Sequence, residues 1–340
     1  MCLACAEAHA SVPSGVRCLR RACGGQLTGE SQQVRALEMK LKRRQLASKD
    51  MAIETAQVLV TAVGHTKGNN PRHLISEVQD IGRRLEEAAG DGELIVGNIC
   101  RRVLFMIRDE YATLVTVKNS GEGLSEEKAA IAKQPSLGDV LEGDLALPGA
   151  DRIWTDDVPQ SFKSVVVESI KELVKEIETI KEHVADQAME HVHANEVILT
   201  CGYSSTVLHF LTEVARRHRK FEVVVSEMAP SLEGHAMAQA LAKAGIATTV
   251  VTDAAIFAVM ARVNKVIVGC QAVLANGGIT SLTGVHAVAV AAKHYNVPLV
   301  VCTGMYKLAP VFPHDQYSFN ELRSPADVSK LDPAGGIARR

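Results

Sequence analysis

The feature that most constrains the fold is an alternation of short apolar segments with amphipathic ones between Asn195 and Cys302. The apolar segments are rich in β-branched residues, as strands buried on both faces of a sheet are. They lie at 197–200, 221–225, 247–251, 265–268 and 298–301. Helical periodicity places helices between them, at about 206–218, 234–244, 254–263 and 284–295. The alternation predicts right-handed crossovers and a Rossmann-like, doubly wound parallel sheet over residues 194–325.

The part of the chain before this alternation is expected to be helical. Apolar residues recur every three or four positions within 53–63, 74–88 and 96–111. This spacing predicts amphipathic helices packed as antiparallel neighbours in a helical domain over residues 33–116. The same periodicity over residues 161–193 predicts one long helix that bridges the two domains.

Three segments lack any such pattern. Residues 1–32 have no apolar core of the kind that a secretory signal needs, and we expect a disordered tail. The cysteines of this tail lack the paired knuckles of a zinc ribbon, so a tail is favoured over a zinc site. Residues 117–160 predict a flexible, mildly acidic insertion, and residues 326–340 an irregular tail. The four tail cysteines are Cys2, Cys5, Cys18 and Cys23.

The net charge and one turn-rich stretch argue against two classes of protein. The formal net charge is −2, whereas a free-standing nucleic-acid binder usually carries a basic stripe. Residues 266–292 contain no Asp, Glu, Lys or Arg, and this stretch is long enough to span a bilayer. Asn276, Gly277 and Gly278 interrupt it with turn chemistry, so we expect a strand, a loop and a helix rather than a membrane span.

The carboxyl ends of parallel strands are where such sheets bind ligands. Ser204, Ser205 and Thr206 follow the first strand at the start of a helix, where free backbone N–H groups could hold an anion. Asn276, after the fourth strand, completes this candidate anion pocket. The favoured alternative is that Ser204 or Ser205 only caps the helix. Asp253, after the third strand, is expected to cap the helix that follows it.

The sequence offers no support for a cofactor or metal. No G-x-G-x-x-G follows a strand, and no G-x-x-x-x-G-K-[ST] is present, so a nucleotide-binding oxidoreductase has only the fold in its favour. His235 and His286 are acid–base candidates in principle. Neither has a carboxylate placed beside it by the sequence, so a packing or interface role is favoured for both.

A series of longer runs resembles the alpha/beta/delta subunit family of eukaryotic initiation factor 2B, and its beta branch in particular. The resemblance covers residues 33–325. The runs that carry it are 96–104, 107–110, 195–200, 234–237, 244–253, 254–260, 264–269, 274–277, 291–294 and 307–308.

The wider family includes aldose–ketose isomerases of ribose phosphates and methylthioribose phosphate, and this relationship bears on catalysis. Those enzymes carry a catalytic Cys in the loop after the first strand and an Asp after the fourth. The matching positions here are Gly202 and Gln271, with Cys201 one residue early. Glutamine cannot transfer protons as a carboxylate does. The resemblance therefore implies an isomerase scaffold without its catalytic groups. The alternative is a sugar-phosphate isomerase that uses a displaced Cys201 with a nearby carboxylate.

The resemblance also implies partners. It implies a non-catalytic, cytosolic regulatory subunit of the guanine-nucleotide exchange factor for initiation factor 2, with no cofactor. Its partners would be the alpha, delta, gamma and epsilon subunits, together with the alpha subunit of initiation factor 2. In the family, the beta–delta interface lies near the positions that match Asn195 and His235.

The sequence departs from the family after Pro325, where the family continues with a Tyr-Val-Pro-Pro-like run. The resemblance thus predicts a shortened C-terminus. We expect apolar sheet surface to be left uncovered and the isolated chain to be poorly soluble.

Overall fold

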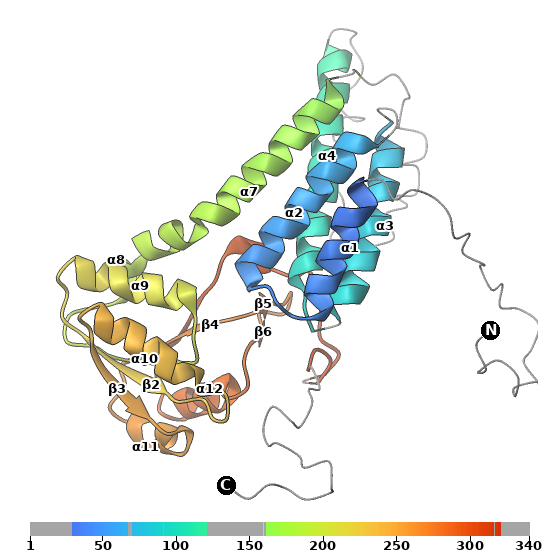
Figure 1. The fold of residues 1–340 in the computed structure, drawn as a ribbon. Coiled ribbons are helices and arrows are strands. Elements are labelled where there is room, and N and C mark those ends of the chain that lie inside the picture. Colours follow the sequence, from blue (N-terminus) through green and yellow to red (C-terminus); the bar gives the residue numbers. More distant parts are fainter. Residues whose placement is uncertain are drawn as a thin grey trace, which may run out of the picture.

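The computed structural model describes residues 29–66, 70–90, 92–120, 159, 161–315 and 317–320. It contains a helical domain and an α/β domain, connected by a long helix that runs from one to the other (Figure 1). The predicted fold class is confirmed. The segments 121–158 and 326–340 and the four tail cysteines lie outside the described residues.

The helical domain buries one continuous apolar core, which includes Leu59, Leu74, Ile107 and Ile170. A local signal sets the start of α3, because the side chain of Asn70 accepts a hydrogen bond from the Arg72 N–H at 2.9 Å. The helices are α1 (Gly29–Lys42), α2 (Ser48–His65), α3 (Pro71–Ala89), α4 (Ile95–Ser120) and α7 (Phe162–Asp186). Thus α1 begins inside the predicted tail 1–32, and α4 extends into the predicted insertion 117–160.

The predicted single helix over 161–193 is divided in two, which corrects that prediction. The helix α7 ends at Asp186, and a short helix, α8 (Ala188–His191), follows. Ile177 of α7 is buried in the core of the helical domain, whereas Ala188 and Val192 are buried in that of the α/β domain. The chain changes direction at Gln187 because its two apolar stripes must face different cores.

The α/β domain is built on a five-stranded parallel sheet with the strand order β3-β2-β1-β4-β7. The strands are β1 (Val197–Cys201), β2 (Glu222–Ser226), β3 (Ala247–Val251), β4 (Lys265–Gly269) and β7 (Leu299–Cys302). One face is covered by α9 (Ser205–Arg216) and α10 (Glu233–Lys243). The other is covered by the 3₁₀ turn η2 (Asp253–Ala255), α11 (Ile256–Met260) and α12 (Val285–His294). The order reverses between β1 and β4, which is where open α/β sheets place their ligands.

A small antiparallel hairpin, not predicted from the sequence, lies in the loop after β4. It consists of β5 (Ala272–Val273) and β6 (Ile279–Thr280). Its strands are too short to show an alternation of apolar and polar residues. The backbone N–H of Ala275 at its tip donates to the Val311 carbonyl at 3.2 Å. The hairpin lies beside the helical domain (Figure 1).

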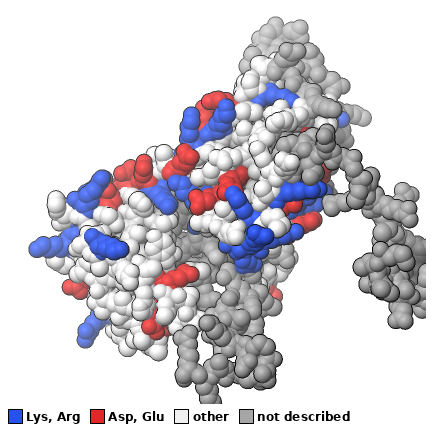
Figure 2. Space-filling model, viewed as in Figure 1, with Lys and Arg blue, Asp and Glu red and all other residues white. Residues whose placement is uncertain are grey.

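Among the described helices, none has both the length and the hydrophobicity that crossing a bilayer requires. Residues 266–292 instead contribute to β4, the hairpin and α12. Charged side chains are dense over α7 and the helical domain, and sparse over the lower part of the α/β domain in the same view (Figure 2).

Candidate functional site

The carboxyl ends of β1 and β4 meet at the switch point of the sheet, and Gly202, which the resemblance matches to the isomerase cysteine, is closely surrounded. Gly202 follows β1 with φ +65°, a conformation that glycine adopts without strain. A Cβ atom there would lie 3.2 Å from Leu282 Cδ1 and 3.3 Å from Met228 Sδ. The position therefore has little room for a cysteine side chain.

The folded environment of Cys201 does not favour the reactive form of its thiol. Its side chain is buried, with only 6% of the residue exposed. Burial, together with the negative charge of Asp253, raises the pKa of the Cys201 thiol to about 12. The thiol is therefore protonated at neutral pH, and the thiolate is the reactive form.

Asp253, the nearby carboxylate, has a different role from the predicted one. It does not cap the helix after β3; its carboxylate accepts hydrogen bonds from the loop after β2. The donors are the hydroxyl of Ser226, the N–H of Met228 at 3.1 Å and the N–H of Ala229 at 2.8 Å. Burial raises the pKa of Asp253, but these three hydrogen bonds outweigh it, and the pKa lies below its usual value. The expected cap is wrong because the loop after β2 offers more donors than the short 3₁₀ turn does.

Gln271 is the residue that the resemblance matches to the second isomerase position, and its side chain has no group that could act as an acid or base. Its backbone N–H donates to the Thr280 carbonyl at 2.8 Å, which closes the base of the hairpin. A carboxamide at this position neither gains nor loses a proton near neutral pH.

The helix cap predicted at Ser204 is confirmed. The Ser204 hydroxyl accepts a hydrogen bond from the Val207 N–H at 3.4 Å. It also packs on the end of β4, since a Cβ atom on Gly269 would lie 2.5 Å from it. Ser205 and Thr206 are half-buried in the first turn of α9.

Among the described residues, no hydrogen bond joins Asn276 to these hydroxyl groups. Asn276 lies exposed at the tip of the hairpin, and its side-chain oxygen accepts a hydrogen bond from the Gly278 N–H at 2.9 Å. The tip pairs with Val311 instead of with the start of α9. The candidate anion pocket of Ser204, Ser205, Thr206 and Asn276 therefore stays a prediction.

The two predicted interface residues lie at opposite edges of the sheet. Asn195 precedes β1 with φ +62°, and its N–H donates to the Lys220 carbonyl at 2.8 Å. His235 is in the first turn of α10, after β2, with its Nε2 3.9 Å from Glu227 Oε2. Asn195 thus lies at the amino ends of the strands and His235 at their carboxyl ends, and a five-residue strand spans about 13 Å between these two ends.

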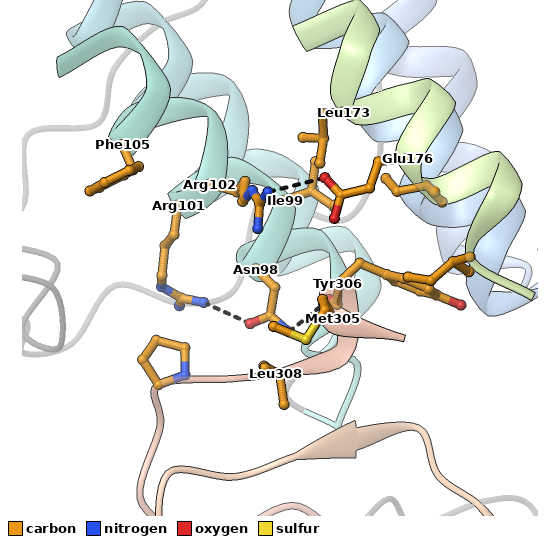
Figure 3. A pocket seen from close by; sticks show the side chains of 13 residues that line it. Asn98, Ile99, Arg101, Arg102, Phe105, Leu173, Glu176, Met305, Tyr306 and Leu308 are labelled. Atoms are coloured by element: carbon orange, nitrogen blue, oxygen red, sulfur yellow. Dashed lines mark hydrogen bonds and ion pairs between the residues drawn. The ribbon is translucent and has the colours of Figure 1, made fainter. Parts of the chain in front are cut away.

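A second feature, missed by sequence reasoning, is a groove of about 250 Å³ between the domains, lined by α4, α7 and the turn η3 (Met305–Lys307) (Figure 3). Its floor is apolar, and its central polar group is Asn98, which is 7% exposed. The Asn98 side-chain N–H donates to the Tyr306 carbonyl at 3.3 Å. Lys307 anchors the same turn to the loop after β4, through a 2.7 Å hydrogen bond to the Cys270 carbonyl. An amide within the buried stripe of α4 was the only sequence signal for this site.

Most of the chain matches one protein family and its relatives. Residues 44–334 match the model of the Initiation factor 2 subunit family. The chain is 40% identical over 319 residues to translation initiation factor eIF2B subunit beta of Dictyostelium discoideum, covering 86% of this chain and 81% of that protein. Identity to the protein of the same name from Schizosaccharomyces pombe is 36%, covering 85% and 81%.

Solved structures give the same relationship. The crystal structure of the tetrameric eIF2B-beta2-delta2 complex from Chaetomium thermophilum contains a chain with a TM-score of 0.67 and 29% identity, covering 86% of this chain and 84% of that one. The crystal structure of eIF2B beta from the same organism gives a TM-score of 0.64 and 28% identity, covering 84% and 80%. By sequence and by fold, the chain belongs to the initiation factor 2 subunit family, and it is similar to the family's eIF2B beta members.

Proposed function

We propose that this chain is a non-catalytic regulatory subunit of the guanine-nucleotide exchange factor for translation initiation factor 2. It assembles in the cytosol with alpha, delta, gamma and epsilon subunits and binds the alpha subunit of initiation factor 2. The observation that carries the proposal is a switch point without working catalytic groups, in a chain similar to eIF2B beta subunits along most of its length. Gly202 and Gln271 occupy the two isomerase positions, and Cys201 is buried and protonated.

The groups at the carboxyl ends of the strands give little support to the isomerase alternative. A proton shuttle requires groups whose pKa values lie near the working pH. The pKa of Cys201 is about 12, and Asp253 is held as a carboxylate by three hydrogen bonds. An assay with ribose 1-phosphate derivatives and methylthioribose 1-phosphate should show no turnover above that of buffer.

Assembly tests the proposal directly. The chain should be incorporated stoichiometrically when it is co-expressed with the alpha, delta, gamma and epsilon subunits, as judged by native mass. The complex should release labelled GDP from initiation factor 2, and phosphorylation of the factor's alpha subunit should inhibit that release. A chain that binds none of these subunits would overturn the proposal.

Asn195 and His235 are proposed as contacts to the delta subunit. Because they lie at opposite edges of the sheet, the partner must contact each edge separately, or two neighbouring subunits must share them. Asn195→Ala and His235→Ala should then weaken assembly independently, with additive effects on the free energy of binding. Ser205 and Thr206 remain candidates for an anion site, and titration with inorganic phosphate in the presence of Thr206→Val would test them.

A further inference from the structure

The outer faces of α11 and α12 carry large apolar side chains, although both helices lie on the outside of the α/β domain. Ile256, Met260 and Val288 point inward and are buried against the sheet. On the outer side, Phe257 is 48% exposed and Val290 is 52% exposed. The other exposed positions include four alanines and three polar residues of α12, namely Ala254, Ala258, Ala261, Ala287, His286, Lys293 and His294. All five residues of α11 are apolar, and a helix that is apolar all round is usually buried on all sides.

The helix layer on the opposite face of the sheet behaves differently. The helix α10 buries Met237 and Leu241 but exposes Gln239 and Lys243. In α9, Glu213 pairs with Arg216 and Arg217 on the surface. None of the large apolar side chains of α9 and α10 is exposed, whereas the α11–α12 layer exposes Phe257 and Val290. The contrast indicates that the α11–α12 layer is covered in the working protein.

Aromatic rings tie the two exposed helices together. The ring of Phe257 lies 4.9 Å from that of His294 and 5.2 Å from that of Tyr295, measured between centroids. The His294 and Tyr295 rings are 5.0 Å apart. Such a packed aromatic group is rigid and half-exposed, which is typical of residues that anchor protein interfaces.

The charge of this layer indicates which kind of partner fits. Residues 254–314 contain no Asp or Glu. Two exposed cations lie on this layer. Arg262 is two residues beyond the end of α11, and Lys293 is in the last turn of α12. Two copies that met through α11 and α12 would bring Arg262 and Lys293 of both copies together, and neither helix contains a carboxylate to pair with them, which disfavours self-association. A different chain with carboxylates around an apolar patch would be complementary.

We propose that the outer face of α11 and α12 is where this chain receives a different subunit of its assembly, one that presents an apolar patch edged by carboxylates. The inference rests on the proposed function and adds the location and chemistry of the contact. The face is continuous with the edge that carries Asn195. Asn264, just beyond α11, accepts a hydrogen bond from the Val197 N–H at 2.8 Å, and Val197 is two residues from Asn195.

The test is binding of the delta subunit to the full chain carrying single substitutions. Val290→Asp and Phe257→Asp should each weaken delta binding at least tenfold, because a carboxylate in a desolvated, acid-edged contact is unpaired. Met39→Asp on α1 is the matched control, since Met39 is exposed to a similar extent, 49%, and lies in the helical domain. Circular dichroism should show the wild-type fold and midpoint for all three. Wild-type affinity in both α11–α12 variants would overturn the inference.

A charge series tests the chemistry of the partner. Replacing Arg262 and Lys293 together by Glu should weaken delta binding more than replacing both by Gln, and added salt should weaken the wild-type complex. Equal effects of Glu and Gln would contradict an acidic partner. Sedimentation of the chain alone checks self-association, and a homodimer disrupted by Val290→Asp would overturn the choice of a different subunit. If the wild-type chain binds no subunit, the proposed function fails and this inference falls with it. If the wild-type chain binds delta and the α11–α12 variants bind it equally well, the inference alone fails.

Discussion

Asp253, just after β3, accepts a hydrogen bond from the buried hydroxyl of Ser226, at the end of the neighbouring strand β2. The same carboxylate also accepts the N–H groups of Met228 and Ala229 at 3.1 and 2.8 Å. One side chain thus organises the loop that leads into α10 and its first-turn residue His235. The contact orders the carboxyl edge of the sheet without giving it catalytic chemistry.

Asp253→Asn should destabilise the chain by about 2 kcal/mol at pH 7, because the amide loses charge-assisted hydrogen bonds and turns a donor toward other donors. The pKa of Asp253 is lowered in the folded state by its hydrogen bonds, which outweigh the opposing effect of burial. The carboxylate's contribution is therefore fully present above the unfolded pKa of about 3.9 and is lost as the pH falls through the folded value.

Urea unfolding at a series of pH values measures this effect. The difference between wild type and Asp253→Asn should be constant from neutral pH down to about pH 5 and shrink below it. Asp186→Asn is the control, because that carboxylate is exposed and comes no closer than 3.7 Å to Arg217, its ion-pair partner. A difference that persists unchanged at low pH would contradict the role assigned to the Asp253 charge.

Gly234→Ala should destabilise the chain by about 3 kcal/mol, because the added methyl group overpacks against rigid backbone. A Cβ atom at Gly234 would lie 1.9 Å from the Ser226 carbonyl oxygen, so α10 would have to move away from β2. Gly64→Ala is the matched control, since that Cβ would meet no atom within 4 Å in α2. The control should stabilise the chain by up to about 1 kcal/mol. Thermal and urea unfolding distinguish the two; equal stability of both variants would refute the close approach.

Cys201 should react with iodoacetamide only after the α/β domain unfolds. Its pKa of about 12 leaves almost no thiolate at pH 8, and burial blocks access. Peptide mass spectrometry before and after urea treatment measures the labelled fraction. Cys201→Ala should leave assembly with the delta subunit unchanged. Rapid labelling in the native state would revive the displaced-nucleophile alternative.

Asn98→Ala should destabilise the contact between the two domains by about 2 kcal/mol, because the Tyr306 carbonyl loses its donor in a buried site. Hydrogen exchange should rise locally in η3, residues 305–307. Arg102→Ala on the same groove is the control, because its 3.1 Å ion pair with Glu176 is exposed and worth less than about 1 kcal/mol. Unchanged exchange in η3 would show that Asn98 does not couple the domains.

Leu299→Lys should reduce self-association of the isolated chain. The edge strand β7 is Leu-Val-Val-Cys, apolar on both faces, and Leu299 is exposed. Charged side chains on edge strands prevent strands from pairing between molecules. The control is Thr249→Lys on β3, the opposite and more polar edge. Light scattering against concentration measures the effect; an equal benefit from both substitutions would point to net charge instead.

The sequence by itself determined the five strands of the parallel sheet, their order along the chain and the presence of helices between them. Short β-branched runs cannot be stable except as buried strands, and helical periodicity between them leaves room only for parallel crossovers. The cap at Ser204 was equally readable, because a cap depends on residues within one turn. That Gly202 and Gln271 offer neither a thiol nor a carboxylate was also readable, because residue identity alone decides it.

Only the tertiary structure decided the contacts between residues far apart in the chain. Asp253 was free to cap its own turn, yet the loop after β2, more than twenty residues earlier, offered it three donors. The two-residue strands of the β5–β6 hairpin form because Val273 and Ala275 pair with the segment beyond β7. The break at Gln187 arises from two cores competing for one helix. In each case local preference was weak, and long-range packing and hydrogen bonding determined the outcome.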